Sequence, residues 1–165
     1  MRRRAAACEP VHVVDDLRLD DRARIEQLAV AYAYAVDDRE WTAFERLYVP
    51  DATIDYRSAG GIAGTPTEVA AWLAETSTMF SWSMHSMSTQ RIEFTGPTTA
   101  TGSMHVFARY GLVWDGVEEL MDVSAVYHDE YVRTDTGWRF ASRREQTNSV
   151  SGGRFADLVR TTLPR

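Results

Sequence analysis

The chain of 165 residues contains no lysine, a single cysteine and no long apolar run. Its 18 basic residues are all arginines, and with 24 acidic residues the formal net charge is −6, which argues against a nucleic-acid partner. Cys8 has no partner for an internal disulfide, and the cysteine and histidines lack the spacing of a metal site. No segment is long and apolar enough to span a membrane. The composition places no restriction on a small neutral ligand.

The N-terminal segment begins like a secretory signal peptide, with arginines at positions 2–4 ahead of three alanines. No apolar core of about seven residues follows before Glu9 and Pro10, so the pattern of such a signal is incomplete. Residues 1–18 have mixed charge and no periodicity, and we expect them to form an arm that is disordered or packs on a neighbour. A cytoplasmic location is the simplest expectation.

Residues 19–148 are predicted to form one domain whose first half is helical. The first helix is expected to use Asp20 or Asp21 as its N-cap and to reach Asp37, with one apolar face made of Ile25, Leu28, Ala29, Tyr32, Ala33 and Val36. A second helix is expected over residues 41–48, ended by Pro50, and a third is expected to begin at Pro66. Residues 149–165 are expected to form a tail or a short helix that caps a pocket.

The second half of the domain is predicted to be mostly strand. Turn signals at residues 95–97, 115–116 and 135–137 separate alternating runs over roughly residues 84–94, 98–114, 117–133 and 138–148, and residues 52–56 form an earlier strand. Strands of this length must bend or bulge. We therefore predict an α+β fold in which three N-terminal helices cover the concave face of a strongly curved antiparallel sheet. Such a cone encloses a mostly apolar pocket.

Three residues of this pattern could provide an acid, a base and a phenol in that pocket. Asp37 continues the apolar face at the end of the first helix, where burial of a carboxylate is costly unless it is paired, although it could also be solvated there. His85 can accept and return a proton near neutral pH, although lone strand histidines are more often structural. Tyr56 could stabilise an oxyanion without carrying charge, or serve only as a core aromatic.

The order of these residues resembles the nuclear transport factor 2 superfamily, and particularly its scytalone dehydratase and SnoaL-like branches. The resemblance runs roughly from residue 19 to 146 and is carried by Asp37-Asp38-Arg39-Glu40-Trp41 and by Ile54-Asp55-Tyr56-Arg57-Ser58. It implies a cone-shaped α+β fold, an Asp37 that orients His85, and a Tyr56 that holds a water against a substrate carbonyl.

The sequence also departs from the dehydratase pattern. The dehydratase has polar substrate contacts at the positions of Val36, Ala125 and Tyr127. The position of its second histidine falls nearer Tyr110 or Gly111, several residues away from His105. These differences indicate a different substrate. The residues expected to bind it are aromatic, methionine and histidine side chains, which suit a flat or polycyclic ligand: Tyr32, Trp41, Trp82, Met87, His105 and Tyr127.

The predicted function is that of a cofactor-independent dehydratase, cyclase or isomerase of secondary metabolism, acting through an enolate on a hydrophobic polyketide-like or aromatic carbonyl compound. A non-catalytic ligand-binding module and the structural β subunit of a ring-hydroxylating dioxygenase remain open, because this fold hosts both. No metal and no organic cofactor is expected; Gly60, Gly61 and Gly64 lack the order of a dinucleotide fingerprint.

A homodimer or homotrimer is expected, because no helix is left to cover the outer face of the sheet. The apolar residues expected on that outer face are Val106, Val113, Val123, Val132 and Phe140.

Overall fold

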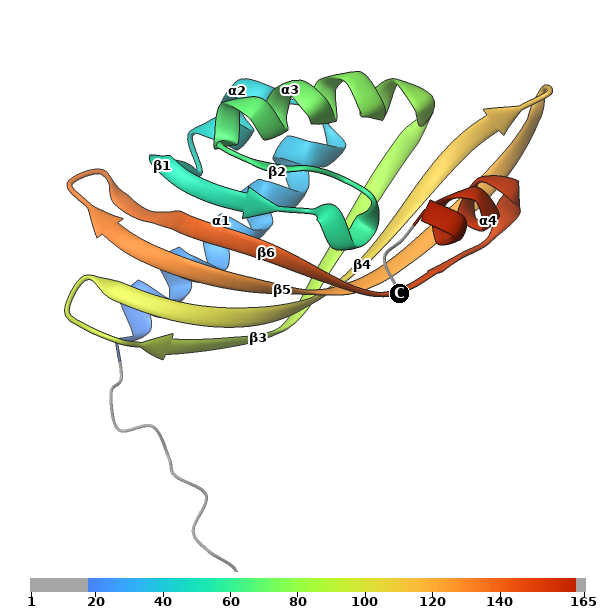
Figure 1. The fold of residues 1–165 in the computed structure, drawn as a ribbon. Coiled ribbons are helices and arrows are strands. Elements are labelled where there is room, and N and C mark those ends of the chain that lie inside the picture. The colour runs from blue at the N-terminus through green and yellow to red at the C-terminus, as the bar shows by residue number, and fades with distance from the viewer. Residues whose placement is uncertain (1–17, 163–165) are drawn as a thin grey trace, which may run out of the picture.

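A curled six-stranded sheet with three helices over its concave face makes up the fold in the computed structural model, which describes residues 18–162 (Figure 1). The helices are α1 (Leu19–Asp37), α2 (Trp41–Glu45), α3 (Pro66–Thr76) and α4 (Gly153–Thr162), with short 3₁₀ turns at Arg57–Ala59 (η1) and Ser77–Met79 (η2). The strands are β1 (Tyr48–Asp55), β2 (Ala63–Gly64), β3 (Trp82–Phe94), β4 (Thr99–Trp114), β5 (Val117–Thr134) and β6 (Gly137–Ser151).

The α+β cone expected from the sequence is confirmed, and the sheet has the order β2-β1-β6-β5-β4-β3. It is mixed rather than wholly antiparallel, because β1 runs parallel to β6. Apolar alternation indicates which face a strand buries but not its direction, so the parallel pair was not predictable. As expected, the long strands bend at bulges, located near Thr89 on β3 and opposite Ala141 on β6.

The helix boundaries differ from the prediction in two places. Helix α1 begins at Leu19, two or three residues earlier than predicted, and neither Asp20 nor Asp21 is its N-cap. The Asp21 carboxylate instead accepts hydrogen bonds from Arg18 and from the indole of Trp138. Helix α2 ends at Glu45, and Tyr48 to Pro50 begin β1. Pro50 is tolerated in this strand because the register with β6 is interrupted between Tyr48 and Thr53.

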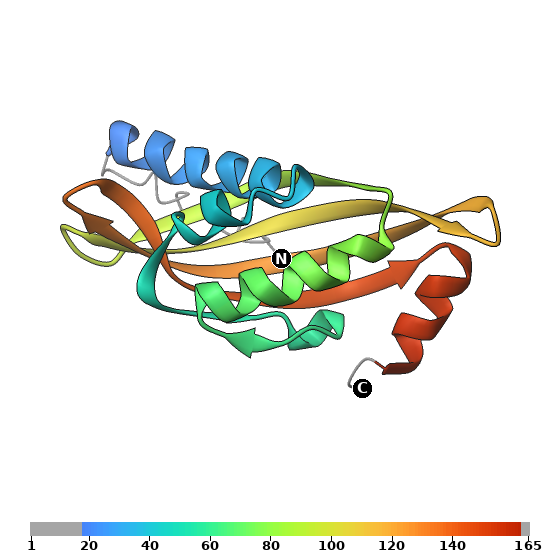
Figure 2. The ribbon, with the colours of Figure 1, turned by 90° about the horizontal axis from the view of Figure 1, so that it is seen from above.

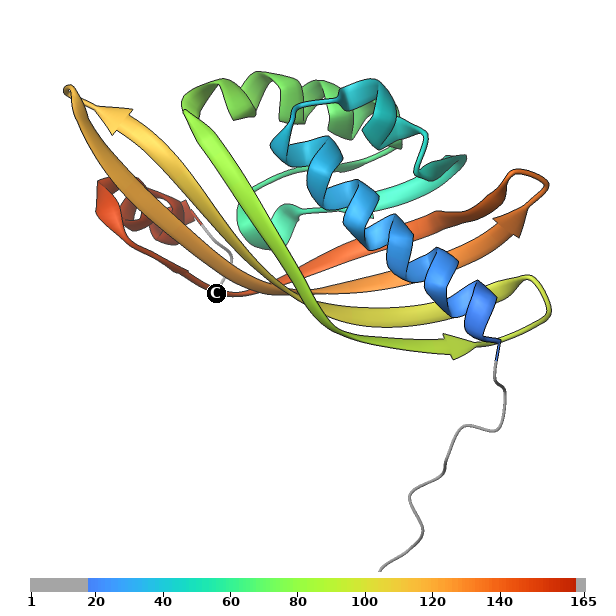
Figure 3. The ribbon, with the colours of Figure 1, turned by 180° about the vertical axis from the view of Figure 1, so that it is seen from behind.

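The three N-terminal helices cover the concave face of the sheet. Seen from above, α1 and α3 both lie across the sheet, while α4 lies against its far end (Figure 2). Seen from behind, α1 runs alongside the edge strand β3 (Figure 3), with Arg22 bonded to Ile92 at one end and Asp37 to His85 at the other. Helix α3 starts with a capping box in which Thr65 and Glu68 satisfy each other's backbone N–H groups. Across residues 18–162, no helix combines the length and the apolar character that crossing a membrane requires.

A fully buried ion pair lies under α1. Arg143 on β6 donates two hydrogen bonds, both of 2.8 Å, to the carboxylate of Asp129 on β5. Tyr131 donates a further hydrogen bond of 2.9 Å to that carboxylate. The guanidinium carbon lies 4.2 Å from the ring centroid of Tyr32 and 4.3 Å from that of Tyr127. Because the pair is desolvated, each charge depends on the other to remain buried.

The predicted set of outer apolar residues is correct only in part: Val113 is exposed and Val132 is half-buried. Val106 and Phe140 are buried in the core, and Val123 lines a cavity on the concave side. The exposed large apolar residues on β3, β4 and β5 are Trp82, Met84, Phe107, Val113, Trp114, Val117 and Leu120. The prediction took apolar strand residues without fixing which face each one occupies, and a shift of one residue exchanges the faces.

Replacing Asp129 with asparagine should destabilise the fold strongly, because Arg143 would keep a buried positive charge without a counter-ion. We expect a loss of about 3–5 kcal/mol in the free energy of unfolding, measured by urea denaturation at neutral pH. Asp122→Asn is the matched control: its ion pair with Arg109 is partly exposed on the outer face, so its loss should cost about 0–1 kcal/mol. Equal losses in the two variants would contradict this account.

Candidate active site

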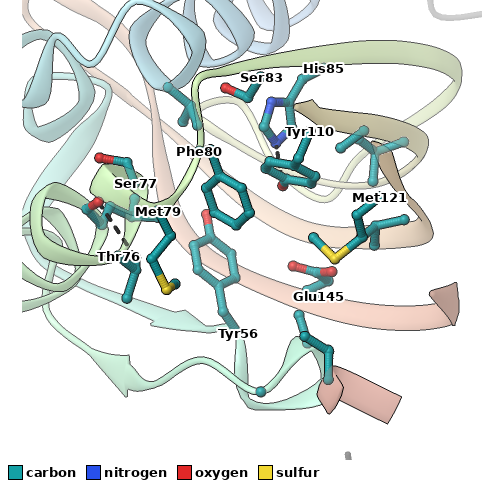
Figure 4. Close-up of a pocket in the computed structure, with 18 of the residues that line it drawn as sticks. Tyr56, Thr76, Ser77, Met79, Phe80, Ser83, His85, Tyr110, Met121 and Glu145 are labelled. Atoms are coloured by element: carbon teal, nitrogen blue, oxygen red, sulfur yellow. Dashed lines mark hydrogen bonds between the residues drawn. The ribbon is translucent and has the colours of Figure 1, made fainter. Parts of the chain in front are cut away.

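A cavity of about 280 Å³ lies between the concave face of the sheet and the helices (Figure 4). Its walls are mostly apolar, with Val36 from α1, Leu73 from α3, Met121 and Val123 from β5 and Phe80 from the segment before β3. Helix α4 adds Phe155 and Val159 to the wall, so the C-terminal segment contacts the pocket. The polar side chains that line it are few, which is the usual composition of a small-molecule site.

Asp37 and His85 form a close pair beside this cavity. The Asp37 Oδ1 atom lies 2.7 Å from the His85 Nδ1 atom, and Asp37 Oδ2 accepts a hydrogen bond of 2.8 Å from the backbone N–H of His85. Ser83 donates a third hydrogen bond, of 2.9 Å, to Oδ1. The side chains of His85 and Asp37 are 4% and 19% exposed. Thus the end of α1 fixes both the backbone and the ring of His85.

The electrostatics of Asp37 follow from these contacts. Burial favours the neutral acid, but the hydrogen bonds from His85 and Ser83 and the charge of the imidazole together hold the pKa of Asp37 below its ordinary value. Asp37 is therefore a carboxylate near neutral pH, and it accepts the Nδ1 proton of His85. The Nε2 atom is then the basic nitrogen of the ring. It lies 3.3 Å from the hydroxyl of Tyr110, which donates to it in this tautomer.

Three tyrosine hydroxyls meet at the floor of the cavity. The hydroxyl of Tyr32 on α1 lies 2.9 Å from that of Tyr56 and 3.3 Å from that of Tyr127 on β5. Burial raises the pKa of each of these phenols, against the lowering effect of the Arg143 charge. The three groups remain neutral hydrogen-bond donors, and the ring of Tyr32 packs edge-on against His85 with centroids 6.3 Å apart. We call this set the tyrosine cluster.

Glu145 on β6 is a further polar residue of the cavity wall. It is 9% exposed, and its Oε1 atom accepts a hydrogen bond of 3.1 Å from Thr147. Burial raises the pKa of Glu145 above its ordinary value, although the hydrogen bond from Thr147 and the charges of His85 and Arg143 oppose that shift. Its carboxyl group projects into the pocket (Figure 4).

The structure brings most of the predicted site residues together. His85, Tyr56, Tyr32, Trp41 and Tyr127 all line the cavity, and Asp37 lies behind His85 as its partner.

Three residues predicted to bind substrate lie elsewhere. Trp82 and His105 are on the outer face of the sheet, where Trp82 donates a hydrogen bond to Glu118. Met87 faces inward but packs into the core beyond the cavity. Successive strand residues point to opposite faces of the sheet. Trp82 and His105 therefore point outward, whereas their neighbours Ser83 and Val106 face the cavity.

Sequence reasoning missed Tyr110 as a contact of His85, and it missed Glu145 altogether. Tyr110 shares the inward face of β4 with Val106 and Ala108, and that alternation was a usable signal. Glu145 was hidden by the bulge in β6. Trp138 and Phe140 face inward, but the extra residue at Ala141 reverses the alternation, so that Arg143 and Glu145 face inward after it.

Within residues 18–162, no cluster of three or more His, Cys, Asp or Glu side chains is placed to hold a metal ion. The polar side chains of this pocket include an oriented imidazole, a neutral tyrosine cluster and a buried carboxyl group. Together they can move a proton and stabilise a developing oxyanion.

Comparison with known proteins identifies the family of the chain. The model of the SnoaL-like domain family matches residues 17–144. The uncharacterized protein Rv2910c of Mycobacterium tuberculosis is 33% identical over 128 residues, which are 77% of this chain and 85% of that protein.

Solved structures share the fold over most of the chain. The Kfla4162 protein of Kribbella flavida superposes with a TM-score of 0.74 at 29% identity, covering 86% of this chain and 98% of that one. A hexachlorocyclohexane dehydrochlorinase (LinA) Type2 gives 0.72 at 25% identity, covering 82% and 90%. A putative scytalone dehydratase of Novosphingobium aromaticivorans gives 0.71 at 23% identity, covering 81% and 87%, and shows the fold alone. The resemblance seen in the sequence is confirmed, and the chain belongs to the SnoaL-like domain family.

Proposed function

We propose that this protein is a cofactor-independent lyase or isomerase in which His85 removes a proton from a carbon next to the carbonyl group of a small hydrophobic compound. The observation that carries the proposal is the Asp37–His85 pair, whose ring nitrogen Nδ1 is bound while Nε2 is directed to the cavity. A solvent-exposed Asp37 would have favoured a binding module or a structural subunit instead. The two side chains are largely buried, which supports the enzyme.

The chemical step follows from the geometry. The C–H bond breaks, its proton moves to Nε2 of His85, and the electron pair forms an enolate with the substrate carbonyl. Asp37, held as a carboxylate, stabilises the imidazolium that results, as a carboxylate does for a catalytic histidine in other enzymes. Hydroxyl groups of the tyrosine cluster, with Tyr56 nearest the η1 turn, stabilise the enolate oxygen. Loss of a leaving group, ring closure or reprotonation at another carbon would complete a lyase, cyclase or isomerase reaction.

The size of the cavity narrows the substrate class. Small-molecule sites span about 300–1,000 Å³, and the cavity of about 280 Å³ lies at the lower end of that range. Phe80, Tyr110 and Trp72 present flat rings to it. A mono- or bicyclic aromatic carbonyl compound fits such a space better than a large fused polyketide. The dehydrochlorinase activity named for the LinA structure supports proton removal as the chemistry of this pocket.

The proposal also includes a homo-oligomer packed through the outer face of the sheet. Trp82, Met84 and Phe107 are each between 38% and 49% exposed on adjoining strands, and an apolar patch of this kind is a common subunit contact.

Removing either member of the pair should abolish proton removal. The probe is exchange of the α-hydrogens of 1-indanone, a bicyclic aromatic ketone, for deuterium in heavy water, followed by NMR. His85→Ala and Asp37→Asn should each slow the enzymatic exchange by about 10²–10⁴-fold, and the double variant should be no slower than His85→Ala because the two act as one unit. His105→Ala, on the outer face, is the control and should exchange at the wild-type rate. A double variant whose rate loss equals the product of the two single losses would show that Asp37 and His85 do not act as one unit.

The stability of the fold should depend on the ionisation of Asp37. Its pKa is lowered in the folded state, so the stabilisation is complete above the ordinary aspartate pKa and is lost as the pH falls through the folded value. Asp37→Asn should therefore be less stable than wild type at neutral pH, and the difference should shrink in acid. Urea unfolding across a pH series measures this, with Asp38→Asn at the exposed neighbour as the control. A difference that stays constant with pH would show that Asp37 is not stabilised as an anion.

Packing through the outer face predicts a mass in solution that is a multiple of 18.7 kDa. Phe107→Glu, which places a charge in the exposed patch, should shift the protein to the monomer, because burying an unpaired charge in an interface is unfavourable. Sedimentation at micromolar concentration measures both masses, and Glu130→Gln, elsewhere on the sheet, serves as the control. A sharp monomer for the wild type would refute the assembly.

A further inference from the structure

The buried carboxyl group of Glu145 has no role in the proton removal proposed above. It lines the same cavity as His85 but comes from β6, where it pairs in register with Tyr127 of β5. Ser58 fixes the backbone around Glu145. Its hydroxyl donates a hydrogen bond of 2.8 Å to the backbone carbonyl of Glu145 and accepts one of 3.1 Å from the backbone N–H of Thr147. Among residues 18–162, its side-chain carboxyl forms no salt bridge and one hydrogen bond, that from Thr147.

Burying a carboxyl group without a cation is costly unless the group is neutral. Arg143, two residues before Glu145 on the same buried side of β6, gives its paired donors to Asp129 rather than to Glu145. Arg144, the adjacent residue, is exposed. The other titratable groups that line the pocket are His85 on β3, Tyr110 on β4, Tyr127 on β5, Tyr32 on α1, Tyr56 before η1 and Arg39 after α1. The guanidinium of Arg39 is exposed and donates to the backbone carbonyl of Phe80. The phenols are neutral and cannot compensate a carboxylate. The structure thus holds Glu145 in surroundings that suit the protonated acid.

The two carboxyl groups of this region therefore have opposite environments. Three hydrogen bonds and the imidazole lower the pKa of Asp37, whereas burial raises the pKa of Glu145. Two acids whose surroundings separate their protonation states in this way can take different roles. Asp37 supports His85 as a carboxylate, whereas Glu145 is placed to hold a proton.

We propose that Glu145 is the general acid of the site and that the reaction is elimination of water from a β-hydroxy carbonyl compound. This inference rests on the proposed function of His85. The carbon–hydrogen bond next to the carbonyl breaks and its proton goes to Nε2 of His85. The carbon–oxygen bond to the β-hydroxyl then breaks, its electrons leave with the oxygen, and the Glu145 proton joins them to form water. A carbon–carbon double bond forms between the two carbons.

The need for Glu145 depends on the leaving group. Hydroxide is a poor leaving group and requires a proton, whereas a halide leaves as a stable anion without one. A pocket that only removed hydrogen halide would have no use for a protonated carboxyl. After the step His85 is an imidazolium and Glu145 a carboxylate; His85 releases its proton to water and Glu145 takes one from water, which restores the resting site.

The protonation state of Glu145 can be tested without any substrate. Infrared spectroscopy across a pH series detects the carbonyl stretch of protonated carboxyl groups. We expect one such band to persist above the ordinary glutamate range in the wild type, to be missing from Glu145→Gln, and to remain in Glu93→Gln, an exposed strand glutamate. Circular dichroism checks that both variants are folded. A Glu145→Gln spectrum that keeps the band overturns the proposal.

The catalytic role is tested with two probes that differ only in the leaving group, 3-hydroxyindan-1-one and 3-bromoindan-1-one. Glu145→Gln should slow elimination of water by about 10²–10⁴-fold but elimination of bromide by less than about tenfold, because only the first needs the proton. His85→Ala should slow both. Equal slowing of the two reactions by Glu145→Gln, or a wild type inert on both compounds, overturns the assignment of Glu145. A His85→Ala enzyme as fast as wild type would instead overturn the proposed function.

Discussion

The contact between the end of α1 and the start of β3 is the interaction on which the site depends. An aspartate at the C-terminal end of a helix meets the unfavourable end of the helix dipole and also loses hydration when it is half-buried. Three hydrogen bonds offset this cost, two of them from His85 itself. Because the carboxylate binds both the backbone and the ring of one residue, it sets the position of β3 and the direction of the imidazole together.

The remainder of the pocket complements that contact. Arg143 lies beneath the tyrosine cluster, and its pairing with Asp129 lets a positive charge remain under neutral phenols without attracting solvent. Glu145, unlike Arg143, has no ion pair among the described residues, and its carboxyl group accepts one hydrogen bond. The cavity therefore contains an imidazole oriented by Asp37, a set of neutral hydroxyl donors and a buried carboxyl group, set in mostly apolar walls. Hydrogen bonds are electrostatically stronger in such surroundings than in water.

Sequence periodicity located most of this fold and part of the site. The turn signals placed the end of β4 at Trp114 and the start of β5 at Val117, and the helical periodicity placed the end of α1 at Asp37. The pairing of Asp37 with His85 came from the resemblance to SnoaL-like sequences. The parallel pairing of β1 with β6 could not be read, because alternation carries no strand direction. Glu145 stayed hidden because a single extra residue at Ala141 reverses which positions of β6 face inward, and a bulge leaves no mark in an alternating pattern.

The central claim is that Asp37 holds His85 with its proton on Nδ1 and with Nε2 unprotonated, where it accepts a hydrogen bond from Tyr110. Nitrogen-15 NMR of the labelled protein at neutral pH measures this directly, since the two ring nitrogens differ in shift when only one carries a proton. The account predicts a protonated Nδ1 and an unprotonated Nε2 for His85, with that preference lost in Asp37→Asn. A proton on Nε2 and a bare Nδ1 in the wild type would contradict it.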